Sequence, residues 1–400
     1  MSEGGDVTQP EAISPSPAEA PKAGGVKIKL FARTDVGQVR EHNEDNFLVA
    51  DLTRKVNGLQ EGSRDVVLGS AGHLLAVCDG MGGAAAGEIA SQLAVDIIYQ
   101  QMLEGAEPSE PTDRNDLARR LVRAVETAGL RIFQEAKADR TRRGMGTTVT
   151  AAALVDDHLF LAQVGDSRAY ILRNGTLVQV TRDQSLVNQL IEAGQLTEEE
   201  AETFEHNNII LQALGTADTV QVDLTYVALH RGDVLMMCSD GLSGMVRGDE
   251  IREVLKAHAD PLDACKTLTE RANLAGGHDN ITVIVARFDG DALPPEDPNG
   301  EPLKYKKYPL PQEEETEPGR RQIASLPTAP SKSGSPDGQA SDPAPAQAAA
   351  VSSVPPAEPS YTMEDERVDI PGTHVPAGVV VALIVGVIAL LGATAFLLLR

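Results

Sequence analysis

Four aspartates stand at the beginning or end of short apolar runs, and each has Gly or Asn beside it. These residues are Asp79, Asp166, Asp240 and Asp279. Any one of them alone fits a turn or a cap equally well. If the ends of the runs converge, uncompensated carboxylates would repel one another and lose hydration, at a cost of several kcal/mol. A hard divalent cation with oxygen ligands removes that cost, so the four aspartates are candidate metal ligands.

Other kinds of site lack the residues that they need. The eight histidines are scattered without an HExxH zinc motif, and no GxSxG sequence is present for a nucleophile elbow. The sequence from Asp79 to Gly83 lacks the later acidic ligands of an EF-hand. Glu88 stands where a phosphate-binding loop needs Lys. Carboxylate ligands for a hard cation are therefore the favoured chemistry.

The net charge and the cysteine spacing argue against several classes of protein. With 35 basic and 59 acidic side chains, the formal net charge is −24. This argues against nucleic-acid binding, because contacts to phosphate need a basic surface. The three cysteines, Cys78, Cys238 and Cys265, lack CxxC spacing, so we expect reduced thiols rather than a disulfide or a structural zinc site.

The apolar patterns predict the elements that must position the aspartates. Ile89, Leu93 and Ile97 share one face of a predicted helix, and a second helical stripe runs from Leu117 to Ile132. The strands come in adjacent groups and the two long helices are neighbours in sequence. This order favours an α+β layered sandwich with mainly antiparallel sheets over an alternating βαβ fold. The predicted strands are 26–31, 47–50, 74–78, 147–155, 159–164, 177–180, 222–229, 234–238 and 281–288.

Proline marks the expected limits of the domain. Only three of the 24 prolines fall between residues 27 and 288. The flanking segments 1–26 and 289–376 are rich in Ala, Ser and Glu and poor in aliphatic residues. Such segments bury too little apolar surface to offset chain entropy, so we expect a disordered N-terminal segment and a disordered Pro-rich linker. We expect one globular domain over 27–288.

Six short motifs, in order, resemble the bacterial branch of the metal-dependent protein serine/threonine phosphatases, the type 2C or PPM family. The resemblance covers all of 27–288. Any one motif is modest support, but six in the right order are strong support. The motifs are Arg40–Asp45, Val77–Gly83 with Gly87–Ser91, Gly144–Thr148, Val164–Tyr170, Ser239–Leu242 and Gly277–Thr282.

The resemblance implies a four-layer α/β/β/α sandwich, in which helices flank two mainly antiparallel sheets. It also implies two to three Mn²⁺ or Mg²⁺ ions at one end. By position, Asp79 would bridge two ions and the Gly80 carbonyl would bind one of them. Asp240 and Asp279 would bind the other. Asp166, with Asp240, resembles the third-metal site of the bacterial members.

Two more acids and one arginine belong to the implied site. Asp45 resembles an acid that holds metal-bound water, and Glu44 would reach the centre through water. Arg40 matches the arginine that holds the substrate phosphate, to which it can donate two parallel hydrogen bonds. Residues 183–215 match the flap beside the active site. The implied catalytic residues are Arg40, Asp45, Asp79 and Asp240.

Several positions near the motifs are expected to have other roles. Gln184 replaces a His that is usual in that stretch of the family, which we expect to affect the flap or the substrate contact and not the metal ligands. Met81 stands where many eukaryotic relatives have a His, although bacterial relatives also have Met. We expect Thr147 and Thr148 to form a turn into a strand, and Arg168 to make an exposed salt bridge.

The implied function is hydrolysis of phosphoserine and phosphothreonine in proteins by a metal-bridging water, without a phosphoenzyme. The expected partners are phosphoproteins, serine/threonine kinases and the substrates of those kinases, with no nucleic acid. Two alternatives stay open. One is a catalytically silent phosphoprotein-binding scaffold, and the other is a two-metal hydrolase of small phosphoesters.

The C-terminal segment predicts a membrane anchor. Residues 377–399 are 23 residues without a charge. At about 1.5 Å per residue they span about 34 Å, enough to cross a bilayer. Residues 1–25 have no apolar region of a signal peptide. We therefore expect a single-pass tail-anchored membrane protein whose catalytic domain is cytoplasmic.

Overall fold

A computed structural model describes residues 25–59, 65–82, 86–104, 112–201, 204, 208–295, 297 and 300–310. The predicted membrane segment 377–399, residues 1–24 and residues 311–376 lie outside these ranges. Within the described ranges, no helix is both long enough and apolar enough to span a bilayer.

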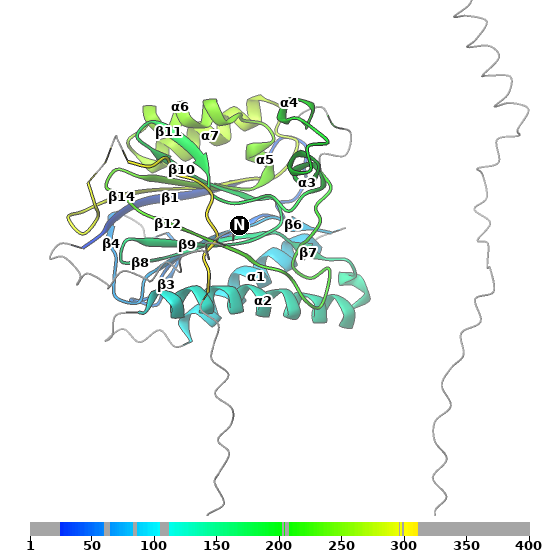
Figure 1. The fold of residues 1–400 in the computed structure, drawn as a ribbon. Coiled ribbons are helices and arrows are strands. Elements are labelled where there is room, and N and C mark those ends of the chain that lie inside the picture. Colours follow the sequence, from blue (N-terminus) through cyan, green and yellow to red (C-terminus); the bar gives the residue numbers. More distant parts are fainter. Residues whose placement is uncertain are drawn as a thin grey trace, which may run out of the picture. The chain divides into compact units, whose positions relative to one another are not determined.

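Within the described residues, two six-stranded sheets form the centre of the fold, and neighbouring strands are antiparallel (Figure 1). A small sheet pairs β6 (Gly80–Met81) with β7 (Gly146–Thr147). The first large sheet has the order β11 (Thr176–Gln179), β10 (Arg168–Arg173), β13 (Val234–Cys238), β14 (Ile281–Asp289), β1 (Lys27–Asp35) and β4 (Asp65–Val67). The second has the order β12 (Asp223–Ala228), β9 (His158–Val164), β8 (Val149–Val155), β5 (His73–Cys78), β2 (Asn46–Asp51) and β3 (Val56–Asn57).

Helices cover the outer faces of both sheets (Figure 1). The helices of the second sheet are α1 (Ala86–Leu103) and α2 (Arg114–Ala138), and those of the first are α6 (Gly248–Ala257) and α7 (Pro261–Leu274). The predicted sandwich of two antiparallel sheets flanked by helices is therefore confirmed. Three short helices, α3 (Leu186–Glu192), α4 (Glu198–Ala201) and α5 (Asp240–Ser243), lie at the same end of the sandwich as β6 and β7 (Figure 1).

The helix α2 follows directly from its sequence. It begins after Asp113, whose carboxylate accepts hydrogen bonds from the main-chain N–H groups of Asn115 and Asp116. The predicted stripe from Leu117 to Ile132 is fully buried against the second sheet. Each large apolar side chain in such a stripe contributes about 2 kcal/mol through burial. Packing of this stripe therefore fixes the position of α2, and the C-terminal end of α2 leads toward β7.

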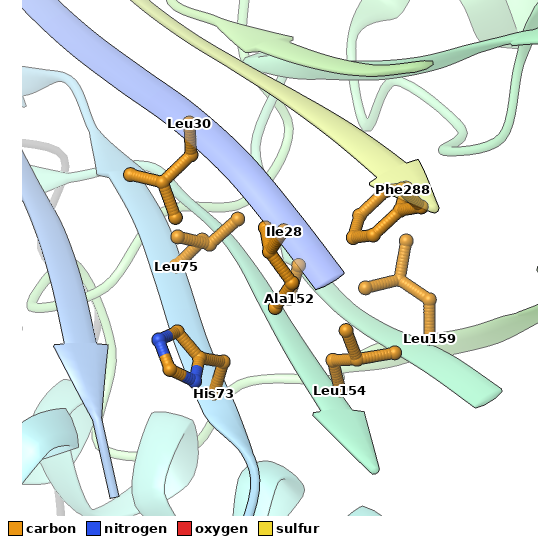
Figure 2. A pocket seen from close by; sticks show the side chains of 8 residues that line it. All are labelled: Ile28, Leu30, His73, Leu75, Ala152, Leu154, Leu159 and Phe288. Atoms are coloured by element: carbon orange, nitrogen blue, oxygen red, sulfur yellow. The ribbon is translucent and has the colours of Figure 1, made fainter. Parts of the chain in front are cut away.

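The space between the two sheets is filled by apolar side chains. A cavity of about 10 Å³ remains where β5 begins, lined by seven apolar side chains and His73 (Figure 2). Burial lowers the pKa of His73, which favours the neutral ring, and its Nδ1 has no hydrogen-bond partner within the described residues. The cavity has room for about one water molecule. The candidate metal-binding acids lie at the opposite end of β5, where Asp79 follows Cys78.

Residues 303–310, which we call the strap, continue the folded unit past the domain boundary predicted at residue 288. The strap pairs with the edge strand β12, since Tyr308 N–H donates to the Leu224 carbonyl (2.9 Å) and Tyr226 N–H to the Lys306 carbonyl (3.2 Å). The Tyr308 ring packs edge-on against Phe160, with a centroid distance of 4.9 Å. This segment therefore covers an otherwise open sheet edge.

Two strap side chains bind one buried carboxylate. Asp223, at the start of β12, is 9% exposed. Its Oδ2 accepts a hydrogen bond from the Tyr305 hydroxyl (2.5 Å), and its Oδ1 lies 2.8 Å from Lys307 Nζ. A buried carboxylate needs such partners, so the strap and β12 stabilise each other.

Replacing Tyr308 with Ala in the full chain should lower the free energy of unfolding by about 2 kcal/mol, because the ring packs on Phe160 and Tyr226. Chemical denaturation followed by circular dichroism measures the change. The matched control is Lys304→Ala, at an exposed strap position, which should stay within about 0.5 kcal/mol of the wild type. Equal stability of the two variants would contradict a strap that belongs to the folded unit.

Candidate active site

The second sheet brings two of the acids together. In an antiparallel pair, the start of one strand lies beside the end of its neighbour. Asn46, the first residue of β2, lies opposite Cys78, the last residue of β5. Asp45 and Asp79 are the next residues outward and therefore occupy the same end of the sheet.

The first sheet brings three further acids to the same end of the fold. Cys238, the last residue of β13, lies opposite residues near the starts of both β14 and β10. Asp240 follows two residues later, while Asp279 and Asp166 each stand two residues before their strands. Antiparallel pairing therefore places these three acids side by side. The strand ends that carry the acids therefore converge, a point that the sequence left open.

Hydrogen bonds join the acids of the two sheets. Ser239 Oγ, from the first sheet, donates to Asp45 Oδ2 of the second (2.7 Å). The same Oγ accepts from Thr282 N–H (2.9 Å), so its position is fixed on both sides. The carboxyl groups of Asp79 and Asp240 also share a hydrogen bond. The five acids thus form one cluster across the end of the sandwich.

Burial and mutual repulsion raise the pKa values of four of these acids, Asp45, Asp79, Asp166 and Asp240. Burial, together with the charges of Asp240 and Asp279, raises the pKa of Asp45 to about 7. Burial likewise raises the pKa of Asp166 to about 7, with a further contribution from Asp240. The pKa of Asp79 lies well above its ordinary value for the same reasons. A nearby cation would offset these effects.

Three carboxylate oxygens of the cluster are buried and have no hydrogen-bond partner within the described residues: Oδ1 of Asp45, Asp166 and Asp240. Buried polar atoms are normally paired, so these oxygens point to a missing partner. In the described ranges, no group of three or more His, Cys, Asp or Glu side chains is spaced so that it could hold a metal ion. Repulsion between the carboxylates opposes such spacing, and the orphaned oxygens are the hard donors that Mg²⁺ and Mn²⁺ prefer. The residues therefore fit hard divalent cations.

Two glycines let the loops carrying Asp79 and Asp240 approach their neighbours closely. A Cβ atom on Gly80 would lie 2.4 Å from the carbonyl oxygens of both Glu44 and Gly87. A Cβ on Gly241 would lie 2.1 Å from the Asn280 carbonyl oxygen. Neither position has room for a side chain, so glycine is required at both.

Thr147 and Thr148 do more than form the predicted turn, because they hold the main chain of Asp79. The Asp79 carbonyl accepts hydrogen bonds from Thr148 N–H and from Thr147 Oγ1, both at 2.8 Å. Asp79 N–H donates to Thr148 Oγ1 (3.1 Å), which also contacts Ser167 Oγ (2.8 Å). The two threonines therefore fix the backbone of the central acid and leave its carboxylate free.

Asn280 is a site residue to which the sequence assigned no role. Its Nδ2 donates to the carbonyls of Val36 (3.0 Å) and His42 (2.9 Å), and its Oδ1 accepts from Glu44 N–H (2.8 Å). It thereby ties the loop that carries Arg40 to the start of β14. The signal in the sequence was an Asn between a candidate ligand and a strand, which also fits a simple turn.

Arg40 lies at the rim of the acid cluster. Its Nη2 donates to Asp279 Oδ2 (2.8 Å), and its side chain is 51% exposed. Burial raises the pKa of the neighbouring Glu44, while the charge of Arg40 lowers it. The guanidinium is therefore the cation that a solute meets as it approaches the cluster from this loop.

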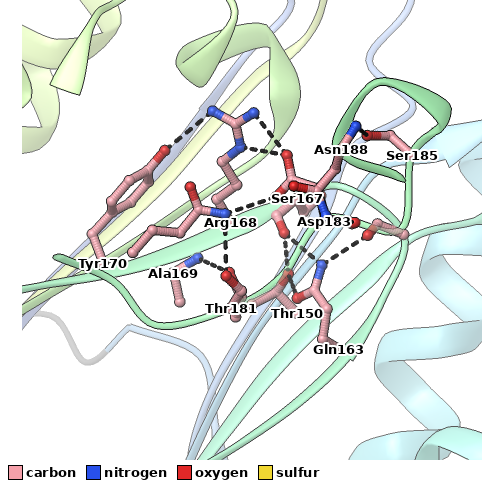
Figure 3. A network of polar contacts seen from close by, with 12 residues as sticks. Thr150, Gln163, Ser167, Arg168, Ala169, Tyr170, Thr181, Asp183, Ser185 and Asn188 are labelled. Carbon is pink, nitrogen blue, oxygen red and sulfur yellow. Dashed lines mark hydrogen bonds and ion pairs between the residues drawn. The ribbon is translucent and has the colours of Figure 1, made fainter. Parts of the chain in front are cut away.

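The expectation of an exposed salt bridge for Arg168 is wrong, because its partner is buried. The guanidinium binds Asp183 through Nε (2.8 Å) and Nη2 (2.7 Å), and Asp183 is 8% exposed (Figure 3). Nη1 also donates to the Tyr170 hydroxyl (3.3 Å). The pair fixes the first residue of the flap segment 183–215 to β10, two residues after Asp166.

Comparisons with known proteins agree with this fold and site. A family model described as Protein phosphatase 2C matches residues 62–276. The chain is 38% identical over 266 residues to protein phosphatase PhpP of Streptococcus pneumoniae, covering 66% of the chain and 100% of the relative. It is 34% identical over 257 residues to serine/threonine phosphatase stp of Listeria monocytogenes, covering 64% and 94%.

Solved structures give the same result. The serine/threonine phosphatase PstP/Ppp of Mycobacterium tuberculosis has 34% identity and a TM-score of 0.55, covering 66% of this chain and 99% of that one. A structure of the PstP catalytic domain in complex with 2 manganese ions has 34% identity and a TM-score of 0.54, covering 66% and 99%. The chain belongs to the protein phosphatase 2C family.

The pH dependence of stability tests the buried cluster in chelator-treated protein. A carboxyl whose pKa is raised on folding stabilises the fold below its unfolded pKa, and this stability is lost as the pH rises to about 7. Asp45→Asn removes the charge, so it should raise the free energy of unfolding by up to about 4 kcal/mol at pH 8 and by less than half as much at pH 5.

The matched control for this test is Glu253→Gln, an exposed acid of α6. Its stability should follow that of the wild type at both pH values in the same denaturation experiment. A loss of stability in Asp45→Asn at pH 8 would contradict the proposed cost of the charged cluster.

Proposed function

We infer that this chain is a metal-dependent protein serine/threonine phosphatase. The observation that carries the inference is the buried acid cluster, in which three carboxylate oxygens have no hydrogen-bond partner within the described residues. Membership of the protein phosphatase 2C family supports it, as do the names of the relatives PhpP and stp and the manganese complex of PstP.

Two to three Mn²⁺ or Mg²⁺ ions are the proposed cofactors. We assign Asp79, the Gly80 carbonyl, Asp240 and Asp279 to two of them, and Asp166 with Asp240 to the third. Bound there, divalent cations supply Lewis acidity toward a phosphate and acidify a water molecule that can attack phosphorus. Substrate binding and proton transfer fall to side chains around this set.

Arg40 is the proposed phosphate-binding residue. Its half-exposed guanidinium presents donors in a planar fork, which suits the oxygens of a phosphate monoester. Asn280 holds the loop that carries it, through the Val36 and His42 carbonyls. Arg40 therefore binds and orients the phosphate at the mouth of the site.

Asp45 is the proposed group that holds or takes up a proton. Ser239 donates to its Oδ2, which leaves Oδ1 buried and without a partner in the described residues. The Oδ1 can therefore accept a hydrogen bond from a water molecule and hold or take up its proton. Glu44 is held beside it, since its carbonyl accepts from Ser91 Oγ (2.6 Å).

The purified full chain should release phosphate from phosphoserine and phosphothreonine peptides when Mn²⁺ is present and should stop when a chelator is added. Asp240→Asn should lower kcat by at least about 100-fold, because one shared ligand is weakened. The matched control is Asp249→Asn, at an exposed position of α6, which should keep wild-type activity.

Release of inorganic phosphate, measured against peptide and nucleotide substrates side by side, separates the alternatives. Peptide binding without turnover at any metal concentration would favour the silent scaffold. Faster turnover of nucleotides would favour a hydrolase of small phosphoesters. Full activity in Asp240→Asn would contradict the metal assignment.

The sequence also supports a location for this activity. Residues 377–399 carry no charge over 23 residues, and we propose that they anchor the chain by its tail in a membrane. The catalytic domain would then be cytoplasmic and joined to the anchor by the Pro-rich linker that follows the strap. Such a tether raises the effective concentration of the enzyme near membrane-linked kinases and their substrates, the partners we propose.

Cell fractionation tests the anchor. The full chain should sediment with membranes and resist extraction by high salt, whereas a chain ending at residue 376 should be recovered in the soluble fraction. Both should show the same Mn²⁺-dependent activity on a soluble phosphopeptide, since the acid cluster is intact in each. Equal distribution of the two chains between the fractions would contradict a membrane anchor.

A further inference from the structure

Gln184 contacts the turn that carries Asp166. Its main-chain N–H donates to the Gly165 carbonyl (2.8 Å), and its Oε1 accepts from Gly165 N–H (3.0 Å). Both polar groups of Gly165 are thus bound by one residue. Gly165 has a φ of 102°, and a Cβ there would lie 2.7 Å from the Thr148 side chain, so the turn admits only glycine.

The same glutamine also binds the other end of the flap. Its main-chain carbonyl accepts from Leu211 N–H (2.8 Å), and its Oε1 accepts a second hydrogen bond from Gln212 Nε2 (3.0 Å). Gln212 in turn binds the main chain of Gln221, whose N–H donates to Gln212 Oε1 (2.6 Å). Gln184 therefore connects the start of the flap, its return and the Gly165–Asp166 turn.

Asp183, directly before Gln184, provides an independent anchor on β10 and β11. It binds Arg168, and its Oδ1 accepts from Gln179 Nε2 (2.7 Å). Its carbonyl accepts from Asn188 Nδ2 of α3 (2.9 Å). Figure 3 shows Arg168, Asp183 and Asn188 meeting at this point. With Asp183 fixed to the first sheet, the side chain of Gln184 is aimed at Gly165 and has little freedom to turn away.

We propose that Gln184 is a positioning residue that holds both ends of the flap on the Gly165–Asp166 turn and so sets the position of the Asp166 carboxylate. The inference rests on the proposed function, in which Asp166 holds a third cation. Any displacement of the flap ends moves the two main-chain groups of Gly165 with them. The flap and the metal-binding acid are therefore linked through the main chain and the carboxamide of one residue.

The chemistry of the carboxamide distinguishes Gln184 from a His placed at the same position. Its Oε1 accepts two hydrogen bonds at once, while its Nε2 faces the carbonyls of Gln163 (3.4 Å) and Gln221 (3.3 Å). A neutral imidazole has one acceptor nitrogen and one donor nitrogen. A His at position 184 could bind either Gly165 or Gln212 through its side chain, but not both.

The test compares Gln184→Met, which keeps the length of the side chain and removes its hydrogen bonds, with Gln184→His. The matched control is Gln189→Met, an exposed position of α3 whose side chain has no hydrogen bond within the described residues. The first readout is amide hydrogen exchange of Gly165 and Leu211 in the full chain without metal, because both amides donate to Gln184. Exchange should accelerate on the order of tenfold in Gln184→Met, less in Gln184→His and not in the control.

The second readout is the Mn²⁺ concentration that gives half-maximal hydrolysis of a phosphopeptide. Gln184→Met should raise it on the order of tenfold and recover most of kcat at high Mn²⁺, because an acid is displaced and not removed. Unchanged exchange at Gly165 together with an unchanged Mn²⁺ requirement would overturn the proposal. Faster exchange spread evenly over both sheets would also overturn it, because that result indicates general destabilisation.

The two readouts separate this inference from the proposed function. Hydrogen exchange needs no turnover, so an inactive wild-type chain would refute the phosphatase assignment and leave the link between Gln184 and Gly165 open to measurement. An active wild type with no effect in Gln184→Met would refute the positioning role alone. Gln184→His keeps a polar side chain that can accept one of the two hydrogen bonds, so it keeps the comparison valid if Gln184→Met unfolds.

Discussion

Five acids of like charge, two of them buried and three partly buried, lie together at one end of the two sheets, and the rest of this structure depends on that constraint. Taking a carboxylate out of water is costly, and placing others beside it adds repulsion. The shifts show this directly, because burial raises the pKa of Asp45 and of Asp166 to about 7. A fold keeps such a cluster only if its apolar core supplies enough stability to offset the cost. The packed layers on both sides of each sheet provide that core.

The polar frame around the cluster binds main chain in preference to carboxylate oxygens. Thr147 and Thr148 hold the backbone of Asp79, and Asn280 holds the loop before Asp45. Each acid is thereby fixed in place while its oxygens stay available. A frame that saturated the carboxylates with hydrogen bonds would lower their energy and leave nothing for a cation to bind. The orphaned oxygens are thus a consequence of how the loops are held.

The sequence predicted the acids and the layers because both have local signals, namely Gly or Asn beside an aspartate and the periods of the apolar runs. It did not predict that the acids converge, since that depends on which strands pair. The roles of Asn280 and Thr148 arise from contacts with residues far away in sequence. The strap was missed because prolines around Tyr305 and Tyr308 indicated disorder, although the lysines beside the two tyrosines are typical of an exposed sheet edge.

A phosphate monoester is an anion, and the described site offers it five acids against few cations. Arg40 already binds Asp279, and Arg168 already binds Asp183, so neither is a free positive charge. At distances of a few ångströms and at low effective dielectric, the phosphate is repelled by the uncompensated acids more strongly than it is attracted by one paired guanidinium. Divalent cations reverse this balance, because each adds two positive charges at the acids themselves. Phosphate binding in this chain therefore depends on metal binding. The binding of divalent cations converts an acidic site into one that attracts an anion.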